Sequence, residues 1–335
     1  MANKLRGYTP EDIRSSWKDQ YEWDRDKIIN DERQIYVAKN DKNSRIVQDS
    51  VGSVLEMMAQ KEAVKGNFTH TNGNKVNEQP YSSSVFISQG REYVNTGEYV
   101  EFECKLPAEE GCFPAGWLLR ADPVWQKSEI DIFEGVGHVN SGEYHVAFHS
   151  HTESKATYQK LGSGIKSGAN ITSEFNLYGA HITENEVDYY FNRKKVASTT
   201  LHDHEKNLKW YMLLNLAIAS SGSWAAGGAT EPYNWNTATL CCRGITVFDG
   251  VPAVGDIAAS KPAESTPIVQ SSTVNATSSD VNDGQDYVSS DLIEPIRKAL
   301  EEASEAIIKA FVEASVEASM DAIEKIEAKR KNRRK

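Results

Sequence analysis

The chain has 335 residues and a formal net charge of −11, from 48 acidic and 37 basic side chains. This negative balance disfavours nucleic acid and anionic membranes as partners, because both carry negative charge themselves. The length allows one large β domain of about 200–250 residues plus appendages. A neutral or weakly charged glycan is the class of partner that fits this charge best.

The cysteines are Cys104, Cys112, Cys241 and Cys242. They show neither metal-ligand spacing nor the dense pattern of a disulfide framework. Adjacent cysteines rarely bond to each other, and Cys104 could meet Cys112 only if their strands pair. We therefore expect four free thiols.

The first residues are polar and then charged, and they lack the apolar centre of a secretory signal. No stretch of the sequence is long and apolar enough to cross a bilayer. We expect no signal peptide, synthesis for the cytoplasm and no membrane partner. Residues 1–24 are interpreted as a lead-in or anchor, in which Thr9 caps a helix that begins at Pro10.

The sequence pattern of residues 25–250 predicts an all-β fold, an antiparallel β-sandwich of the jelly-roll type. Short runs rich in β-branched and aromatic residues alternate there with Asn, Gly and Ser clusters. The runs predicted as strands are 35–38, 54–58, 85–88, 99–106, 116–119, 143–149, 176–182, 186–191, 210–219 and 243–248.

Three carboxylates are concentrated in residues 128–135, Ser-Glu-Ile-Asp-Ile-Phe-Glu-Gly. Alternation along a strand places Glu129 and Asp131 on one face, but it places Glu134 on the other. One extra residue near Ile132 or Phe133, a β-bulge, would return Glu134 to the carboxylate face. The sequence therefore predicts a bulged strand that carries three acids on one side.

Three neighbouring acids repel one another and raise one another's pKa values, so a fold that keeps them usually needs them. Retaining glycosidases use one carboxylate as nucleophile and a second as acid and then base, about 5–5.5 Å apart. The alternative interpretation is an amphipathic strand with a solvated acidic face. Spacing alone does not decide between the two.

Several ordered stretches resemble family 16 of the glycoside hydrolases, in its laminarinase and endo-β-glucanase branch. The segment Glu-Ile-Asp-Ile-Phe-Glu is similar to the bulged active-site signature of that family. The further matches are residues 30–36 (Asn-Asp-Glu-Arg-Gln-Ile-Tyr), 99–107, 111–119, 145–149 and 210–217. Together they extend the resemblance over roughly residues 24–250.

The resemblance implies an endo-acting, retaining hydrolase of a polysaccharide, with Glu129 as nucleophile and Glu134 as acid and base. Asp131 would then tune the charge of Glu129. It implies no metal or other cofactor, and it favours β-1,3- or mixed-linkage glucan as substrate. A β-galactan hydrolase of the agar or carrageenan type is one alternative. A non-catalytic glycan-binding or structural virion component on the same fold is another.

Five residues are predicted to contact the sugar: Trp117, Trp125, His149, Trp224 and Asn215. Indole rings suit this role because the C–H faces of sugars pack on flat π systems. The alternative for each tryptophan is ordinary core packing, and for His149 it is a structural histidine. The resemblance favours the sugar-binding role for Trp117, Trp125 and His149, and it supplies Asn215 from the stretch 210–217. Trp224 and Trp235 lie in the Gly/Ser-rich loop 220–237 and are candidates for the rim of the cleft, with core packing as the alternative.

The chain also departs from the family pattern at sugar-facing positions. It has His181-Ile182 where relatives often carry Glu-Trp, and Ser220-Ser221 where they carry Gly-Gly. The Trp-Pro-Ala-Phe-Trp run becomes Phe-Pro-Ala-Gly-Trp at 113–117. Because the acids are intact, these changes put the substrate in question more than the reaction.

Residues 251–289 are rich in Ala, Ser, Thr, Val and Pro, which predicts a disordered linker. Residues 290–335 predict an amphipathic helix with a narrow apolar stripe, followed by a basic tail. So narrow a stripe needs a partner helix, so we expect homo-oligomers or attachment to a virion through residues 290–330. A hydrolase built in this way suggests a phage-borne depolymerase.

Overall fold

The structure is a computed structural model that describes residues 2–22, 24–71, 73–122, 128–136, 142–151, 156–159 and 164–254. The predicted linker from residue 255 onward and the predicted helix 290–335 lie outside these residues. Their proposed roles in self-association or a virion therefore stay predictions. Among the helices that the structure describes, none is long and apolar enough to pass through a bilayer.

The larger of two sheets contains eleven strands within the described residues. Its main path runs β17 (Lys194–Thr200), β16 (Glu186–Phe191), β15 (Asn176–Ile182), β9 (Tyr99–Lys105), β19 (Thr237–Phe248), β5 (Ser53–His70), β6 (Lys75–Ser83) and β3 (Gln34–Tyr36). β1 (Lys4–Tyr8) pairs with β19, while β2 (Lys27–Ile28) and β4 (Ser44–Gln48) pair with β5. The pairs β2–β5 and β3–β6 are parallel, and the other described pairs of this sheet are antiparallel.

The second sheet has eight described strands and carries the acidic segment. Its order is β13 (Ala156–Gln159), β12 (Glu143–His151), β11 (Glu129–Glu134), β10 (Cys112–Arg120), β18 (Lys209–Ile218) and β7 (Val85–Ile87). β14 (Ile165–Lys166) pairs with β12, and β8 (Val94–Asn95) pairs with β18. The described helical elements are α1 (Pro10–Ser16) and two 3-10 turns, η1 (Asp203–Glu205) and η2 (Trp224–Ala226).

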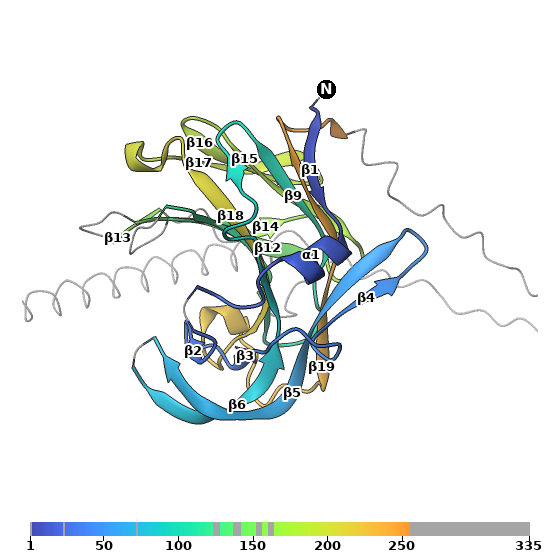
Figure 1. Cartoon of the computed structure of the whole chain (residues 1–335), viewed down its shortest axis with the longest axis vertical. Coiled ribbons are helices and arrows are strands. Elements are labelled where there is room, and N and C mark those ends of the chain that lie inside the picture. The colour runs from blue at the N-terminus through green and yellow to red at the C-terminus, as the bar shows by residue number, and fades with distance from the viewer. Residues whose placement is uncertain are drawn as a thin grey trace, which may run out of the picture. The chain divides into compact units, whose positions relative to one another are not determined.

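The two sheets pack face to face around one large apolar core (Figure 1). Phe133 of β11 lies 4.7 Å from Tyr178 of β15, measured between ring centroids. The Tyr189 hydroxyl of β16 donates a hydrogen bond of 2.7 Å to the Ala147 carbonyl of β12. These contacts confirm the predicted β-sandwich. Each predicted run overlaps a strand, and β15 and β16 have the predicted bounds.

The N-terminal segment packs onto this sandwich. The Thr9 side chain accepts a hydrogen bond from the Asp12 N–H, so it caps α1 as predicted. Ile13 and Trp17 are buried in the main core. Lys18 then forms a bridge to Ile87 at the edge of the second sheet. The residues expected as a lead-in thus bring the chain to the carboxylate-bearing sheet.

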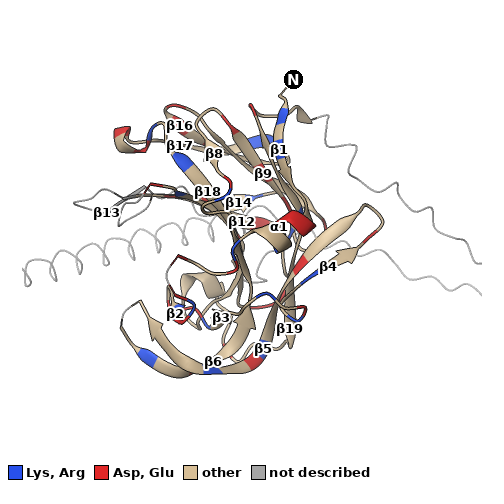
Figure 2. Cartoon of the chain, viewed as in Figure 1, with Lys and Arg blue, Asp and Glu red and all other residues tan. Residues whose placement is uncertain are grey.

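All four cysteines are free, as predicted, and buried. Cys104 does not face Cys112, because β9 pairs with β19 and places Cys104 opposite Cys242. Charges of both signs are interspersed on the larger sheet, as β5 and β6 show (Figure 2). An ion pair of 2.7 Å between Arg193 and Glu101 joins the turn after β16 to β9 there.

Candidate active site

The acidic strand β11 contains the predicted bulge. Against β12, Asp131 lies opposite Ala147 and Glu134 lies opposite His145, so two residues of β11 separate them where β12 has one. On the β10 side the register shifts at the same place and leaves Ile132 as the extra residue. The bulge returns Glu134 to the face that carries Glu129 and Asp131.

Gly116 on β10 is the partner that makes room for this bulge. Phe133 lies opposite Gly116, and a Cβ at position 116 would stand 2.3 Å from the Phe133 ring. The Phe133 ring is completely buried, and its centroid lies 6.1 Å from that of Phe102 and 4.7 Å from that of Tyr178. The departure from the family pattern at position 116 therefore goes together with a phenylalanine inside the bulge of β11.

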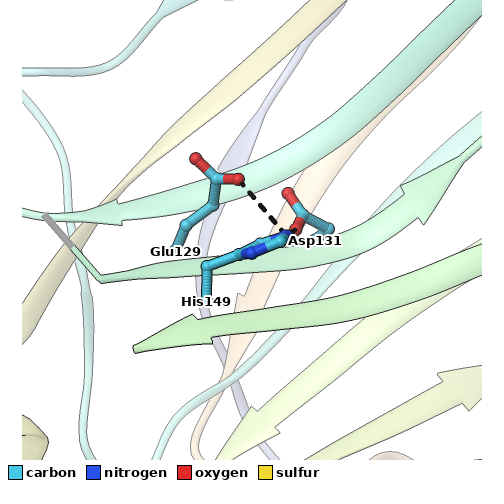
Figure 3. Close-up of side chains that lie close together, drawn as sticks. All are labelled: Glu129, Asp131 and His149. Atoms are coloured by element: carbon cyan, nitrogen blue, oxygen red, sulfur yellow. Dashed lines mark ion pairs between the residues drawn. The ribbon is translucent and has the colours of Figure 1, made fainter. Parts of the chain in front are cut away.

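Glu129, Asp131 and His149 converge on the carboxylate face (Figure 3). His149 lies opposite Glu129 on β12. Its Nε2 is 3.4 Å from Asp131 Oδ2 and 3.9 Å from Glu129 Oε1. The structure thus brings together two predicted catalytic residues and the predicted histidine. Each residue offers one possible metal-ligand atom, and these atoms lie within 4.8 Å of one another.

The two carboxylates differ in access to solvent. The Glu129 side chain is 30% exposed, whereas the Asp131 side chain is 5% exposed. Burial and the neighbouring Asp131 charge raise the pKa of Glu129 well above its ordinary value, and His149 partly opposes this. Burial and the charge of Glu134 also raise the pKa of Asp131. Glu129 can therefore reach a ligand, while Asp131 is placed to share a proton with it.

This raised pKa predicts that Glu129→Gln stabilises the fold at high pH. The folded state binds the Glu129 proton more tightly than the unfolded chain, so wild-type stability falls as pH rises above the ordinary carboxyl pKa. Glutamine stays neutral and avoids this loss. We expect the variant to melt at a higher temperature than wild type at pH 8 and at the same temperature at pH 4. Calorimetry checks this, with exposed Glu78→Gln as control; an equal difference at both pH values would contradict it.

Trp117 and Asn215 lie on the carboxylate face, and both are buried. The Trp117 indole N–H donates to Asn215 Oδ1 at 2.7 Å, and the Asn215 amide donates to the Tyr36 hydroxyl at 3.0 Å. Trp117 lies opposite Asp131, and Asn215 lies opposite Ala115, the partner of Glu134. Asn215 therefore fixes Trp117 beside the acids, and the predicted sugar contact of either residue stays a prediction.

Replacing Asn215 with alanine should destabilise the protein and weaken substrate binding. The substitution leaves the buried Trp117 N–H without its acceptor, which costs about 2 kcal/mol of the free energy of unfolding. We expect KM to rise several-fold because the indole is no longer held. Denaturant unfolding and steady-state kinetics measure the two effects, and Asn185→Ala in an exposed turn is the control. Unchanged stability and KM would show that the bond is dispensable.

Trp224 is half exposed, and its ring centroid lies 4.9 Å from that of His145, edge to face. His145 is the strand partner of Glu134, so the predicted rim tryptophan stands at the Glu134 end of the acidic row. Trp235 packs against Tyr81 instead, with its N–H donated to the Glu110 carbonyl. Trp125 lies outside the described residues.

Sequence reasoning missed one residue of this face altogether. Tyr21, from the segment interpreted as a lead-in, lies 6.1 Å from Trp117 and 5.4 Å from Tyr36 between ring centroids. It is buried, and the charge of Glu129 is among the causes that raise its pKa, after burial itself and the charge of Glu32. A single tyrosine in a polar stretch carries no periodic signal that could have singled it out.

The stretch 30–36 supports the same region from the side. Gln34 donates to Glu32 Oε2 at 2.6 Å and accepts from the Ile218 N–H at 2.6 Å. Burial raises the pKa of Glu32 to about 7. This stretch was singled out by resemblance, and the structure gives it a physical function, which is to anchor the end of β18 and to present Tyr36 to Asn215.

Comparison with known proteins identifies a family model that includes the acidic strand. The family model described as glycosyl hydrolases family 16 matches residues 31–240. An endo-1,3-1,4-beta-glycanase of Rhizobium meliloti, EglC, is 29% identical over 213 residues, which cover 60% of this chain and 42% of that protein. A second one, ExsH from the same organism, is 29% identical over 161 residues, or 47% and 32% of the two chains. The matches thus span less than half of each curated relative.

Among solved structures, that of LamA from Z. galactanivorans in complex with laminaritriose and laminaritetraose is similar. It aligns with a TM-score of 0.55 at 20% identity, over 74% of this chain and 97% of that one. An identity this low supports the shared sandwich fold and nothing finer. The family model covers β3 to the beginning of β19, including every described acid and histidine of the site.

Proposed function

Because the chain belongs to family 16 of the glycosyl hydrolases, we propose that it cleaves internal linkages of a β-1,3- or mixed-linkage glucan with retention of anomeric configuration. One observation carries this proposal. The bulge at Ile132 gathers Glu129, Asp131 and Glu134 on a single face of the sheet. A solvated acidic strand would need no such bulge and would leave Asp131 exposed, whereas Asp131 is buried.

The geometry supports a different chemical role for each of the three acids. Glu129, the more accessible of the pair with Asp131, attacks the anomeric carbon and forms a glycosyl-enzyme intermediate. Glu134 protonates the departing oxygen and then takes a proton from the incoming water. Asp131 holds the proton that Glu129 gives up before attack, because burial and Glu134 favour its neutral form.

The substrate class follows from two observations. The curated relatives are named endo-1,3-1,4-beta-glycanases, and stretch 30–36 resembles the laminarinase branch. The departures at 181–182 and 220–221 keep a β-galactan as the second candidate substrate. A glycan-binding component without activity is the competing class, and intact Glu129, Asp131 and Glu134 argue against it.

The mechanism uses no metal. Glu129, Asp131 and His149 each offer one possible metal-ligand atom close enough for a cation, but an ion held there would offset the negative charge with which Glu129 attacks. We therefore expect full activity after treatment with EDTA and dialysis, measured as reducing ends released from glucan. A loss that added Ca²⁺ or Zn²⁺ reverses would contradict this expectation.

Reducing-end release from laminarin, lichenan and agarose by the full chain tests the proposed function. We expect release from laminarin or lichenan, oligosaccharides as the products, and the β-anomer as the first product seen by proton NMR. Release from agarose alone would move the assignment to the β-galactans. No release from any of the three would favour the glycan-binding class.

A further inference from the structure

A buried carboxylate lies behind the catalytic strand and holds the residue that precedes Glu129. Glu205 of η1 and Ser128 are both completely buried. The Ser128 hydroxyl donates a hydrogen bond to Glu205 Oε1, across 77 positions of sequence. The other carboxylate oxygen accepts from the His202 N–H at 3.0 Å. His204 Nε2 lies 3.5 Å from Oε1.

This arrangement exceeds what the short turn itself requires. A three-residue turn such as η1 can be capped by a side chain at the surface, where water satisfies the rest of the carboxylate. Burying a carboxylate is costly unless its oxygens are hydrogen-bonded. Glu205 is instead fully enclosed and directs one oxygen at Ser128, the residue that immediately precedes β11.

Ser128 is fixed from two directions. Its carbonyl accepts the Arg120 N–H at 3.2 Å in the plane of the sheet. Alternation along the strand turns its side chain away from the face that carries Glu129, so Glu205 holds it from the opposite side. The peptide that leads into Glu129 is therefore held both by β10 and by a buried ionisable group.

We propose that Glu205 is a positioning residue for the reaction: through Ser128 it fixes the backbone from which Glu129 is directed at the anomeric carbon. This inference rests on the proposed hydrolase function. A displacement of about 1 Å at a reacting group can cost about 100-fold in rate, and Glu129 follows directly on Ser128. Glu205 touches no substrate and acts only through that hydrogen bond.

Ser128→Ala removes the hydrogen bond and leaves both carboxylates in place. We expect kcat to fall about 10- to 100-fold with KM within about twofold, since glycan contacts are unchanged. The matched control is Ser198→Ala, which removes a serine bond of 2.6 Å to Asp188 in the other sheet. The control should lose stability without losing kcat. Ser128→Thr, which keeps the hydroxyl, should retain most of the rate.

A β-glucan oligosaccharide linked to a strongly acidic phenol is a substrate that separates the attack by Glu129 from the proton donation by Glu134. Its leaving group needs no proton from Glu134, so the pre-steady-state burst of phenol reports the attack by Glu129 alone. We expect Ser128→Ala to slow this burst by the same factor by which it lowers kcat on the glucan. A wild-type burst rate in a folded Ser128→Ala would overturn the inference while leaving the hydrolase assignment intact. An inactive wild type would overturn both.

Discussion

Glu129→Gln is expected to lower kcat on β-glucan by at least about 10⁴-fold, because an amide cannot form the glycosyl-enzyme bond. KM should stay within a few-fold, since glutamine preserves the size of the side chain and its contact with Asp131. The variant is also expected to melt higher than wild type at pH 8. Loss of activity together with a gain in stability distinguishes this substitution from ordinary damage to the fold.

Steady-state kinetics on laminarin or lichenan measure the effect, with Glu78→Gln as the control for an exposed strand carboxylate. Mass spectrometry of wild type treated with a 2-fluoro glycoside should show the sugar attached to the peptide that contains Glu129. Residual kcat above about 1% of wild type would remove Glu129 from the role of nucleophile. Labelling at Asp131 would assign the role of nucleophile to Asp131 and the role of proton holder to Glu129.

The fold was accessible from the sequence because short runs rich in β-branched and aromatic residues, separated by turn-forming clusters, are a local property. The runs 176–182 and 186–191 predicted both strands with their bounds. The bulge was also accessible, since three acids on one face conflict with strict alternation and one extra residue removes the conflict. Within this hexapeptide, the period of two of a strand and the placement of three acids on one face agree only if the strand contains a bulge.

What the sequence could not supply are the contacts between distant segments. Tyr21 approaches Trp117 because α1 and Lys18 guide the chain along the edge of the second sheet. Asn215 was singled out as a sugar contact, yet its amide is engaged by Trp117 and Tyr36. Glu205 meets Ser128 across 77 positions of sequence. None of these pairings leaves a trace in local periodicity.

Glu134→Gln should have an effect that depends on the leaving group. On a natural glucan the departing sugar oxygen needs a proton, so we expect kcat to fall by about 10³- to 10⁴-fold. On an aryl glycoside with an acidic phenol the first step needs no acid. The burst of phenol should then remain within about tenfold of wild type, while turnover stays slow because water is no longer activated.

This contrast separates Glu134 from Glu129, whose replacement abolishes the burst with either leaving group. Azide supplies the decisive measurement, since it attacks the accumulated intermediate without help from a general base. We expect azide to restore turnover of the aryl glycoside by Glu134→Gln, with a β-glycosyl azide as product. The bulge at Ile132 gives the physical reason, because it alone places Glu134 on the face from which Glu129 attacks. A burst that vanishes in Glu134→Gln, with no rescue by azide, would mean that Glu134 supports the strand and not the proton transfer.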